Sequence, residues 1–506
     1  MATPAPQALI REVRLVPVGG RPAPVAPVDL RIAGGIVTEV GPGLAAGPAA
    51  VVEGEGRWAI PGLWDGHVHM RQWALTATRL DLAGTAHPAE VVRIVAERVA
   101  ALLPVRGAEV ITGFGYRSPE WPRPPTVAEL DAVSGAHPVV LISGDAHNGW
   151  LSSRALELLG VPPRDTVLEE AEWFEVFARL ETLPGAEEQA EEGYRAAAAR
   201  AAAAGVVGIV DMEFGRGYRD WPGRLARGHD ALRVRTATYP DRLDEVIGAG
   251  LRTGRRLPGG GDLLAMGPLK IISDGSLNTR TAFCDAPYAA DLPFPRGRPN
   301  LARDELRRLL ARAREHGLEV AVHAIGDAAA ADAIDAIEAT GAAGSIEHAQ
   351  LLRREDVDRM ARLGIRASVQ PAHVLDDRDP TERIWPDRAG RCFAFRSMRD
   401  AGVVLVLGSD APIAPLDPWL AMAAAVHRSA DAREPWHPEE AVTAADALAA
   451  STDGQGTLAV GSRGDVVLLD DDPLRGGRDT AEVAAGLRRV RVAATFVGGR
   501  PTHPPP

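Results

Sequence analysis

The feature that most constrains the fold is a regular alternation of strand-like and helical segments between about residues 205 and 410. The helical segments end in glycine, and an apolar segment of strand length follows within a few residues. Buried apolar strands that alternate with helices are typical of a parallel sheet covered by helices. Counting from the segment PGLWDGHVH at 61–69 gives about eight strands, the number that closes a (β/α)8 barrel. We therefore predict an α/β fold built on a distorted (β/α)8 barrel.

The two ends of the chain carry a different pattern. Residues 1–58 and 455–506 contain short strand-like segments separated by glycine turns. Because a sheet of only a few strands is marginally stable alone, we predict that the two ends pair to form one β-sandwich beside a barrel at 59–454. Between about residues 75 and 200, helical segments mix with strand-like ones, which indicates an α/β insertion after the first barrel strand.

The composition disfavours several classes of partner. A formal net charge of −12 argues against binding to nucleic acid or to an anionic membrane surface, both of which favour a basic face. The chain has only two cysteines, so no disulfide framework is expected and a cytoplasmic location is favoured. We find neither a secretory signal pattern nor an apolar run long enough to span a bilayer. We expect a small-molecule substrate and, because two-fold assemblies are the commonest oligomers, a homodimer.

Residues that bind metals lie where the predicted strands end. The first strand ends in His67 and His69, which point the same way because side chains alternate along a strand. The reactive side chains of such a barrel lie at the carboxyl ends of its strands. One later strand carries Lys270, and others end in His323, His348, His373 and Asp410. One histidine alone is as readily explained by a hydrogen-bonded core position. Five of the 13 histidines at strand ends favour a site for Zn²⁺ or a similar divalent ion.

Lys270 has two explanations. A lysine inside a buried strand is costly unless it is paired or chemically changed. Burial depresses the pKa of its amine, which can then react with CO₂ to form a carbamate, an anionic ligand able to bridge two metal ions. Equally, Lys270 could form a salt bridge with Asp274 or extend outwards. Residue type alone leaves both explanations open.

Taken together, the motifs of this chain resemble the amidohydrolase superfamily. They are, in chain order, PGLWDGHVH, KIISDGSLNTRTA, VAVHAIGDAA, IEHAQ, SVQPAH and LGSDAPIAPLDPW. They are most similar to the amidohydrolase-3 branch, which contains N-substituted formamide deformylase-like proteins. The resemblance implies a metal-dependent hydrolase that acts on carbon–nitrogen bonds other than peptide bonds. It also implies a distorted barrel with a β-sandwich made from both termini.

The resemblance further implies a role for each motif. Matched motif by motif, it implies a first ion on His67, His69 and Asp410, a second ion on His323 and His348, and a carboxylated Lys270 that bridges the two. A single-ion site formed by His67, His69, His323 and Asp410 stays open. In the family, the residue that matches Asp410 also serves as general base.

We expect hydrolysis of an N-acyl, N-formyl or cyclic amide by a metal-activated hydroxide, with Asp410 as general base and His348 as the second catalytic candidate. Substrate contacts are expected from the insertion and the loops at the barrel mouth, namely Tyr116, His147, Trp150, Arg280 and His373. The aromatic residues among them could equally belong to the core. An isomerase or decarboxylase that uses the same site, and a non-catalytic scaffold, are the alternatives.

Overall fold

The computed structural model describes residues 7–102, 108–118, 121–144, 148–177, 179–288 and 294–504. The chain forms two compact units, one made of residues 1–70 and 198–506 and the other of residues 71–197. The first unit contains the barrel and the strands from both chain ends. The second unit is the insertion between the first and second barrel strands.

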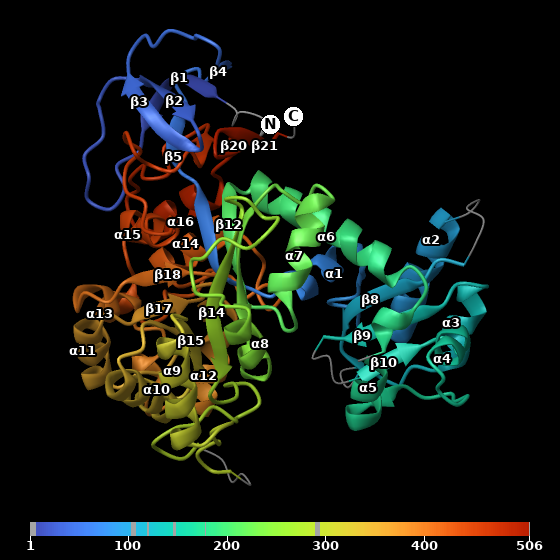
Figure 1. The fold of residues 1–506 in the computed structure, drawn as a ribbon. Helices are drawn as coiled ribbons and strands as arrows, with labels where there is room; N and C mark the ends of the chain where they lie inside the picture. Colours follow the sequence, from blue (N-terminus) through green and yellow to red (C-terminus); the bar gives the residue numbers. More distant parts are fainter. Residues whose placement is uncertain are drawn as a thin grey trace. The chain divides into compact units, whose positions relative to one another are not determined.

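Eight parallel strands form the barrel, and they pair in chain order (Figure 1). They are β6 (Leu63–Val68), β12 (Val206–Asp211), β13 (Arg233–Thr238), β14 (Leu264–Ile272), β15 (Val320–Ala324), β16 (Gly344–His348), β17 (Arg366–Val369) and β18 (Leu405–Leu407). The first and last strands meet just beyond their ends, where the Asp410 N–H donates to the His67 carbonyl oxygen at 2.7 Å and the His69 N–H donates to that of Ala411 at 2.9 Å. The predicted distorted (β/α)8 barrel is confirmed.

Helices connect successive strands around the barrel (Figure 1). They are α7 (Gly217–Ala226), α8 (Leu243–Gly248), α9 (Arg303–Glu315), α10 (Asp327–Thr340), α11 (Arg354–Leu363), α12 (His373–Ile384) and α13 (Phe395–Asp400), with α14 (Pro418–His427), α15 (Ala444–Ala450) and α16 (Thr480–Arg488) after the last strand. α10 and α11 end at Gly341 and Gly364, whose φ angles of 66° and 67° lie in the left-handed region that glycine adopts without strain. These glycines turn the chain directly into β16 and β17.

Strands from both chain ends form one β-sandwich. They are β1 (Ala8–Leu15), β2 (Val28–Ala33), β3 (Ile36–Gly41), β4 (Ala50–Glu53) and β5 (Trp58–Pro61), with β19 (Val466–Leu469), β20 (Val492–Val497) and β21 (Arg500–His503). β1 joins the two layers, because most of it pairs with β2 and β4 while its end pairs with β5. β5 pairs in turn with β19, and Ile10, Leu30, Val466 and Phe496 meet in one buried core. The predicted sandwich of both termini is confirmed.

The insertion is an α/β unit with its own core. Its five-stranded sheet has the order β11-β10-β9-β8-β7. The elements are α1 (Met70–Thr78), β7 (Leu80–Asp81), α2 (Pro88–Leu102), β8 (Ile111–Tyr116), α3 (Val127–Ser134), β9 (Val139–Ser143), β10 (Asn148–Leu151), α4 (Ser153–Leu158), β11 (Leu168–Glu169), α5 (Glu170–Phe177) and α6 (Ala186–Ala203). It begins after β6 and ends before β12, so the predicted α/β insertion after the first barrel strand is also confirmed.

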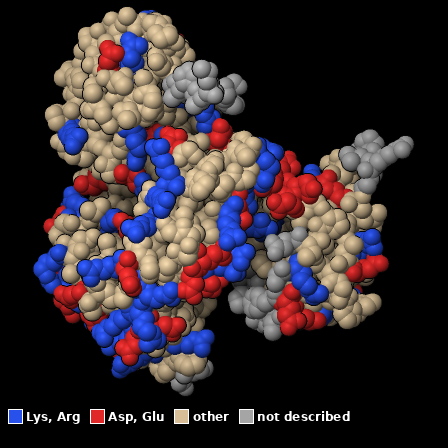
Figure 2. All heavy atoms as spheres, in the orientation of Figure 1, with Lys and Arg blue, Asp and Glu red and all other residues tan. Residues whose placement is uncertain are grey.

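Acidic and basic side chains are interspersed over the barrel on the face drawn in Figure 2. Many of them form ion pairs between neighbouring helices, as Arg359 of α11 does with Asp335 and Glu338 of α10. Within the described part of the chain, no helix combines the length and the apolar character that crossing a membrane requires.

A buried ion pair joins the barrel to the sandwich. Arg233, at the start of β13, donates from Nε and Nη2 to the two carboxylate oxygens of Asp465 at 2.8 and 2.9 Å. The Asp465 side chain is fully buried and also accepts the Gly498 N–H at 2.8 Å. The Asp465 carboxylate therefore binds the barrel through Arg233 and the sandwich through Gly498.

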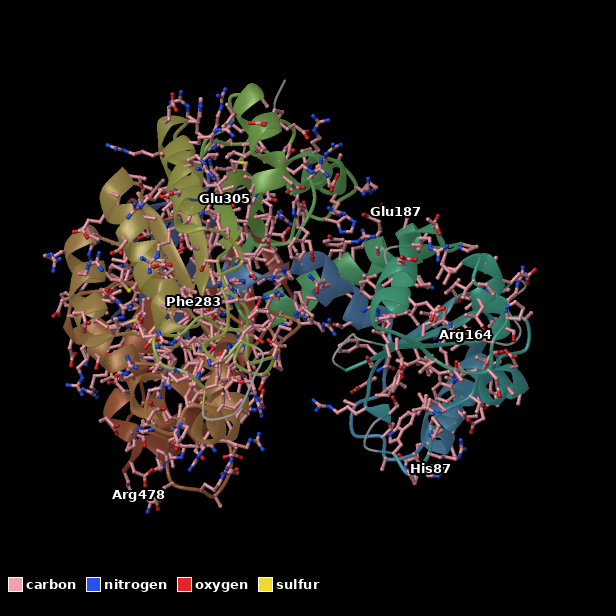
Figure 3. The ribbon with its side chains drawn as sticks, turned by 90° about the horizontal axis from the view of Figure 1, so that it is seen from below. His87, Arg164, Glu187, Phe283, Glu305 and Arg478 are labelled. Carbon is pink, nitrogen blue, oxygen red and sulfur yellow. The ribbon has the colours of Figure 1, made fainter. Side chains whose placement is uncertain are left out.

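We expect Asp465→Asn to lower the free energy of unfolding by about 3–5 kcal/mol, because it removes the buried counter-charge of the Arg233 guanidinium and leaves only Asp262, which is half exposed and 3.2 Å from Nη1. Urea and thermal unfolding measure the loss. Glu482→Gln is the matched control, because its partner Arg478 is 90% exposed, at the edge of the unit in Figure 3. The control should change stability by at most about 0.5 kcal/mol. A loss for Asp465→Asn no larger than that of the control would contradict the role given to this pair.

Candidate metal centre

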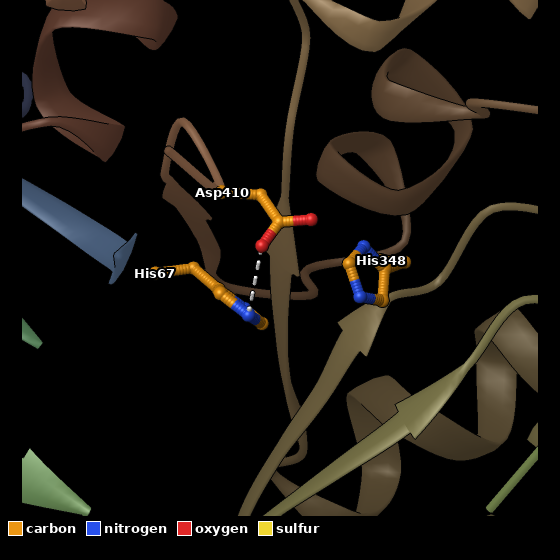
Figure 4. Close-up of side chains that lie close together, drawn as sticks. All are labelled: His67, His348 and Asp410. Carbon is orange, nitrogen blue, oxygen red and sulfur yellow. Dashed lines mark ion pairs between the residues drawn. The ribbon is translucent and has the colours of Figure 1, made fainter. Parts of the chain in front are cut away.

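Three side chains from three different strands converge at the carboxyl end of the barrel. His67 lies in β6, His348 ends β16, and Asp410 follows β18. One ligand atom of each lies within 4.8 Å of the ligand atoms of the other two, and all three residues are buried (Figure 4). The group offers two nitrogen donors and one carboxylate oxygen, a set suited to a divalent metal ion.

His69 and Lys270 adjoin this group. The Nε2 atoms of His67 and His69 each lie 3.4 Å from Asp410 Oδ1, and Lys270 Nζ lies 3.3 Å from His67 Nε2. Lys270 is 2% exposed, so its side chain does not extend outwards. The Asp274 carboxylate, the other predicted partner of Lys270, accepts two backbone N–H groups just before α10. The structure therefore places the Lys270 amine among the predicted metal ligands.

His323 and His373 both lie next to His348. The ring of His323, in β15, lies 4.6 Å from that of His348 between centroids, while its Nε2 faces Asp274 Oδ1 at 3.3 Å and the Gly275 carbonyl oxygen at 3.2 Å. His373 begins α12, and its ring is stacked on that of His348 at 6.3 Å. Its Nε2 is buried and has no hydrogen-bond partner among the described residues, which leaves that atom available to a bound ligand.

Glu347 is a functional candidate that the sequence analysis missed. His67 donates from Nδ1 to Glu347 Oε2 at 2.6 Å, and both side chains are 1% exposed. Ser345 Oγ donates to the other carboxylate oxygen at 2.5 Å. A histidine that donates from Nδ1 keeps the lone pair of Nε2 for a metal ion. The sequence does not indicate this role. Neighbouring side chains in a regular strand point to opposite faces, so Glu347 and His348 are not expected at one site. The regular strand ends at His348, whose φ is 69°.

The backbone at the centre adopts conformations that are rare for residues other than glycine. φ is 69° at His348, 44° at Ala349 and 58° at Asp410. Left-handed backbone of this kind costs energy and is concentrated at functional sites. Two of the three converging side chains stand on such residues, which supports a functional rather than a structural reason for their placement.

Burial sets the protonation of the centre. It lowers the pKa values of His67 and His348 well below their usual range and lowers the pKa of His69 to about 3. These imidazoles are therefore neutral at pH 7, the form that binds a metal. Burial also raises the pKa of Asp410 to about 7, although the nearby Lys270 opposes the change. The donor set fits a divalent cation, whose charge would favour the ionised carboxylate.

The remaining residues predicted to contact the substrate differ in their surroundings. Tyr116 is fully buried and donates to Asn148 Oδ1 at 2.5 Å, and the Trp150 indole N–H donates to a backbone carbonyl at 2.8 Å. Both therefore serve the core of the insertion, the alternative explanation for these aromatic residues. Arg280 is exposed in the loop between β14 and α9. His147 lies outside the described residues.

One signal in the sequence was overlooked. The chain has 56 lysines and arginines, and Lys270 is the only lysine among them. A guanidinium stays protonated in proteins, whereas an amine can lose its proton and react. All the remaining lysine or arginine positions hold arginine, and the one lysine lies inside this centre. This usage indicates that the amine itself is needed there.

The comparison with protein families gives an extensive match. The model of the amidohydrolase family matches residues 50–503. This chain belongs to the amidohydrolase family. It is a metal-dependent hydrolase that acts on carbon–nitrogen bonds, as the family and its hydrolase relatives show.

Individual proteins are similar to this chain over most of its length. Protein LONG AFTER FAR-RED 3 of Arabidopsis thaliana is 28% identical over 499 residues, which cover 89% of this chain and 83% of the relative. The N-substituted formamide deformylase of Arthrobacter pascens is 26% identical, over 92% of each chain. The crystal structure of an uncharacterized metal-dependent hydrolase from Pyrococcus horikoshii OT3 has a TM-score of 0.79 and 27% identity, over 93% of this chain and 98% of that chain. The resemblance to the amidohydrolase-3 branch is thereby confirmed.

We expect Glu347→Gln to weaken metal binding by about 10–100-fold, because the amide lacks the negative charge that holds the His67 Nδ1–H. Competition between the protein and a chelator for added Zn²⁺ measures the change. Glu319→Gln is the matched control, since Glu319 precedes β15 and pairs with the partly exposed Arg366. Equal metal affinity in the two variants would show that Glu347 does not position His67.

Proposed function

We propose that this amidohydrolase hydrolyses a non-peptide amide bond in a small molecule, namely an N-acyl, N-formyl or cyclic amide. The observation that supports it best is the convergence of His67, His348 and Asp410 to within 4.8 Å of one another. The name of the relative from Arthrobacter pascens, N-substituted formamide deformylase, supports a substrate of this class.

The proposed cofactor is one or two divalent ions, with zinc favoured by the mixed nitrogen and oxygen donors. When bound, such an ion polarises a carbonyl oxygen and makes water a stronger nucleophile at neutral pH. We assign His67, His69 and Asp410 to one ion and His323 and His348 to a second. A single ion held by the tight group of His67, His348 and Asp410 is the simpler arrangement of the same residues.

Asp410 is the proposed general base. It would accept a proton from the attacking water and later donate that proton to the leaving nitrogen. Its carboxylate stands at the centre of the group, 3.4 Å from two imidazole nitrogens, and burial raises its pKa to about 7. A bound ion would favour the ionised carboxylate, the form that accepts the proton of the attacking water. His348, neutral and beside Asp410, is the second catalytic candidate.

Lys270 is proposed to be carboxylated. Burial lowers the pKa of its amine, although the carboxylates of Glu347 and Asp410 oppose the change. The neutral amine would attack CO₂, forming an N–C bond while one C=O π bond opens to a carboxylate and the nitrogen releases a proton. A neutral buried amine would thereby become an anionic ligand. The 3.3 Å separation from His67 Nε2 would put the new carboxylate beside the other ligands.

We assign two substrate contacts in the unit that contains the barrel. They are His373, through its buried Nε2, and Arg280, from the exposed loop after β14. The proposed partner is a small molecule, with neither nucleic acid nor membrane, on the strength of the net charge of −12. A cytoplasmic location and a homodimer complete the proposal.

We expect Asp410→Asn to retain bound metal on its histidine ligands but to lower kcat by at least about 100-fold, because the amide cannot accept the proton. Elemental analysis measures the metal, and hydrolysis of a panel of N-formyl and N-acyl amines measures turnover. Asp431→Asn, at an exposed ion pair with Arg433, is the control and should turn over the panel like the unaltered protein. Full activity of Asp410→Asn would refute the assigned role.

We expect ¹³C-labelled bicarbonate to give a carbamate NMR signal that is absent from Lys270→Arg, because arginine remains protonated and does not react with CO₂. Since the chain has no other lysine, the difference between the two spectra needs no further assignment, and any signal from the terminal amine is common to both. Identical spectra would exclude carboxylation of Lys270.

A further inference from the structure

The carboxylate of Asp377, on α12, has hydrogen bonds but no counter-charge. The Asn278 side-chain amide donates to its Oδ1 at 3.4 Å, and the Gln350 side-chain amide donates to its Oδ2 at 3.2 Å. Both donors are uncharged, and no arginine, lysine or histidine among the described residues forms an ion pair with Asp377. A charge that is withdrawn from water without an opposite charge is costly, so this carboxylate requires an explanation.

Two connections place Asp377 beside the metal centre. His373 and Asp377 are four residues apart on α12 and therefore share one face of the helix, and the His373 ring is stacked on that of His348. Gln350, which donates to Asp377, is the second residue after His348. The carboxylate therefore lies one helical turn, about 5 Å along α12, from the proposed substrate contact His373.

Asp377 is mainly ionised at pH 7. Burial raises its pKa to about 6, although the hydrogen bonds from Asn278 and Gln350 oppose the change. The neighbouring Asp376, which is exposed, adds to the negative charge. The Asp377 side chain is only partly buried, which leaves part of it open to a ligand. An ammonium or guanidinium group would supply the opposite charge that the two amides lack.

His373 gives independent support for a ligand on this face of α12. Its Nε2 is buried and has no hydrogen-bond partner among the described residues, whereas buried polar atoms are normally paired. This unpartnered atom stands one turn before Asp377. A single molecule that extends from the metal centre along α12 can therefore contact both side chains.

We propose that Asp377 binds a cationic group, an ammonium or a guanidinium, on the substrate whose amide is hydrolysed at the metal centre. The inference rests on the proposed function and specifies its substrate class. In this assignment Asp377 determines specificity, because it attracts one end of the substrate by charge and takes no part in breaking the amide bond. The substrate then carries its cation at a distance from the scissile carbonyl group.

The test compares formamides in matched pairs. The nitrogen carries an aminoethyl or a propyl group in the short pair, and an aminobutyl or a pentyl group in the long pair, so the members of each pair have equal numbers of heavy atoms and differ in charge. A carboxypropyl compound supplies the opposite charge. With the unaltered protein, kcat/KM for the ammonium compound should exceed that for its uncharged counterpart by at least about tenfold in one of the pairs. The carboxypropyl compound should be the poorest substrate.

Three variants locate the source of this preference. Asp377→Asn should remove the preference for the ammonium compound, and Asp377→Glu, which keeps the charge, should retain part of it. Asp376→Asn is the matched control, because it makes the same chemical change at the exposed neighbouring residue. The control should keep the preference to within about twofold, since exposed charges act weakly.

Calorimetric binding of the same compounds separates this inference from the proposed reaction. If no compound is hydrolysed but an ammonium compound binds more tightly than its counterpart, and Asp377→Asn removes the difference, the role of Asp377 stands and the proposed reaction fails. If the formamides are hydrolysed with no preference for the ammonium compounds, the proposed reaction stands and the inference is overturned. It is also overturned if neither binding nor turnover shows the preference, if Asp377→Asn keeps it, or if Asp376→Asn loses it equally.

Discussion

The site depends on how closely β6 approaches the segment that follows β18. The buried Asp65 carboxylate accepts the N–H groups of His67 at 3.0 Å and of Ser409 at 2.9 Å, and so ties the first and last strands of the barrel together. Gly408 lies directly against this seam, where a Cβ atom would be 2.8 Å from the His67 nitrogen. A side chain there would separate β6 from the Asp410 loop. Closure of the barrel and convergence of the metal ligands are therefore one constraint, met by the same few residues.

This constraint explains which parts of the molecule could be predicted from sequence. Parallel strands in a closed barrel bring their carboxyl ends together whatever the helices contain, so His67, His348 and Asp410 could be grouped without coordinates. Glu347 could not, because side chains alternate along a regular strand and His348, the next residue, already occupies the predicted centre. The left-handed backbone at His348, which ends this alternation, has no signature in the sequence.

The insertion shows the opposite difficulty. Its aromatic residues have the composition of a binding site and of a core alike, and sequence patterns do not separate the two. Tyr116 and Trp150 satisfy their polar atoms with neighbours inside the same unit, as buried aromatic residues generally do. The barrel positions were predictable because topology fixes where strand ends meet, whereas an insertion of mixed elements has no such rule.

The hydrogen bonds at the centre show why a cation belongs there. His67 uses its Nδ1–H on Glu347, so its Nε2 bears a lone pair that faces Asp410 Oδ1 at 3.4 Å. Two acceptors in that arrangement repel each other unless a positive charge or a proton lies nearby, and the Lys270 amine, 3.3 Å from the same nitrogen, supplies one only while it is not carboxylated. Burial raises the pKa of Asp410 to about 7, which provides a proton in part of the population at neutral pH. A divalent ion would replace that proton and satisfy both acceptors at once, so binding of the ion and ionisation of Asp410 are coupled. The same coupling favours the ionised form of Asp410, the form that acts as a base, when the cation is in place.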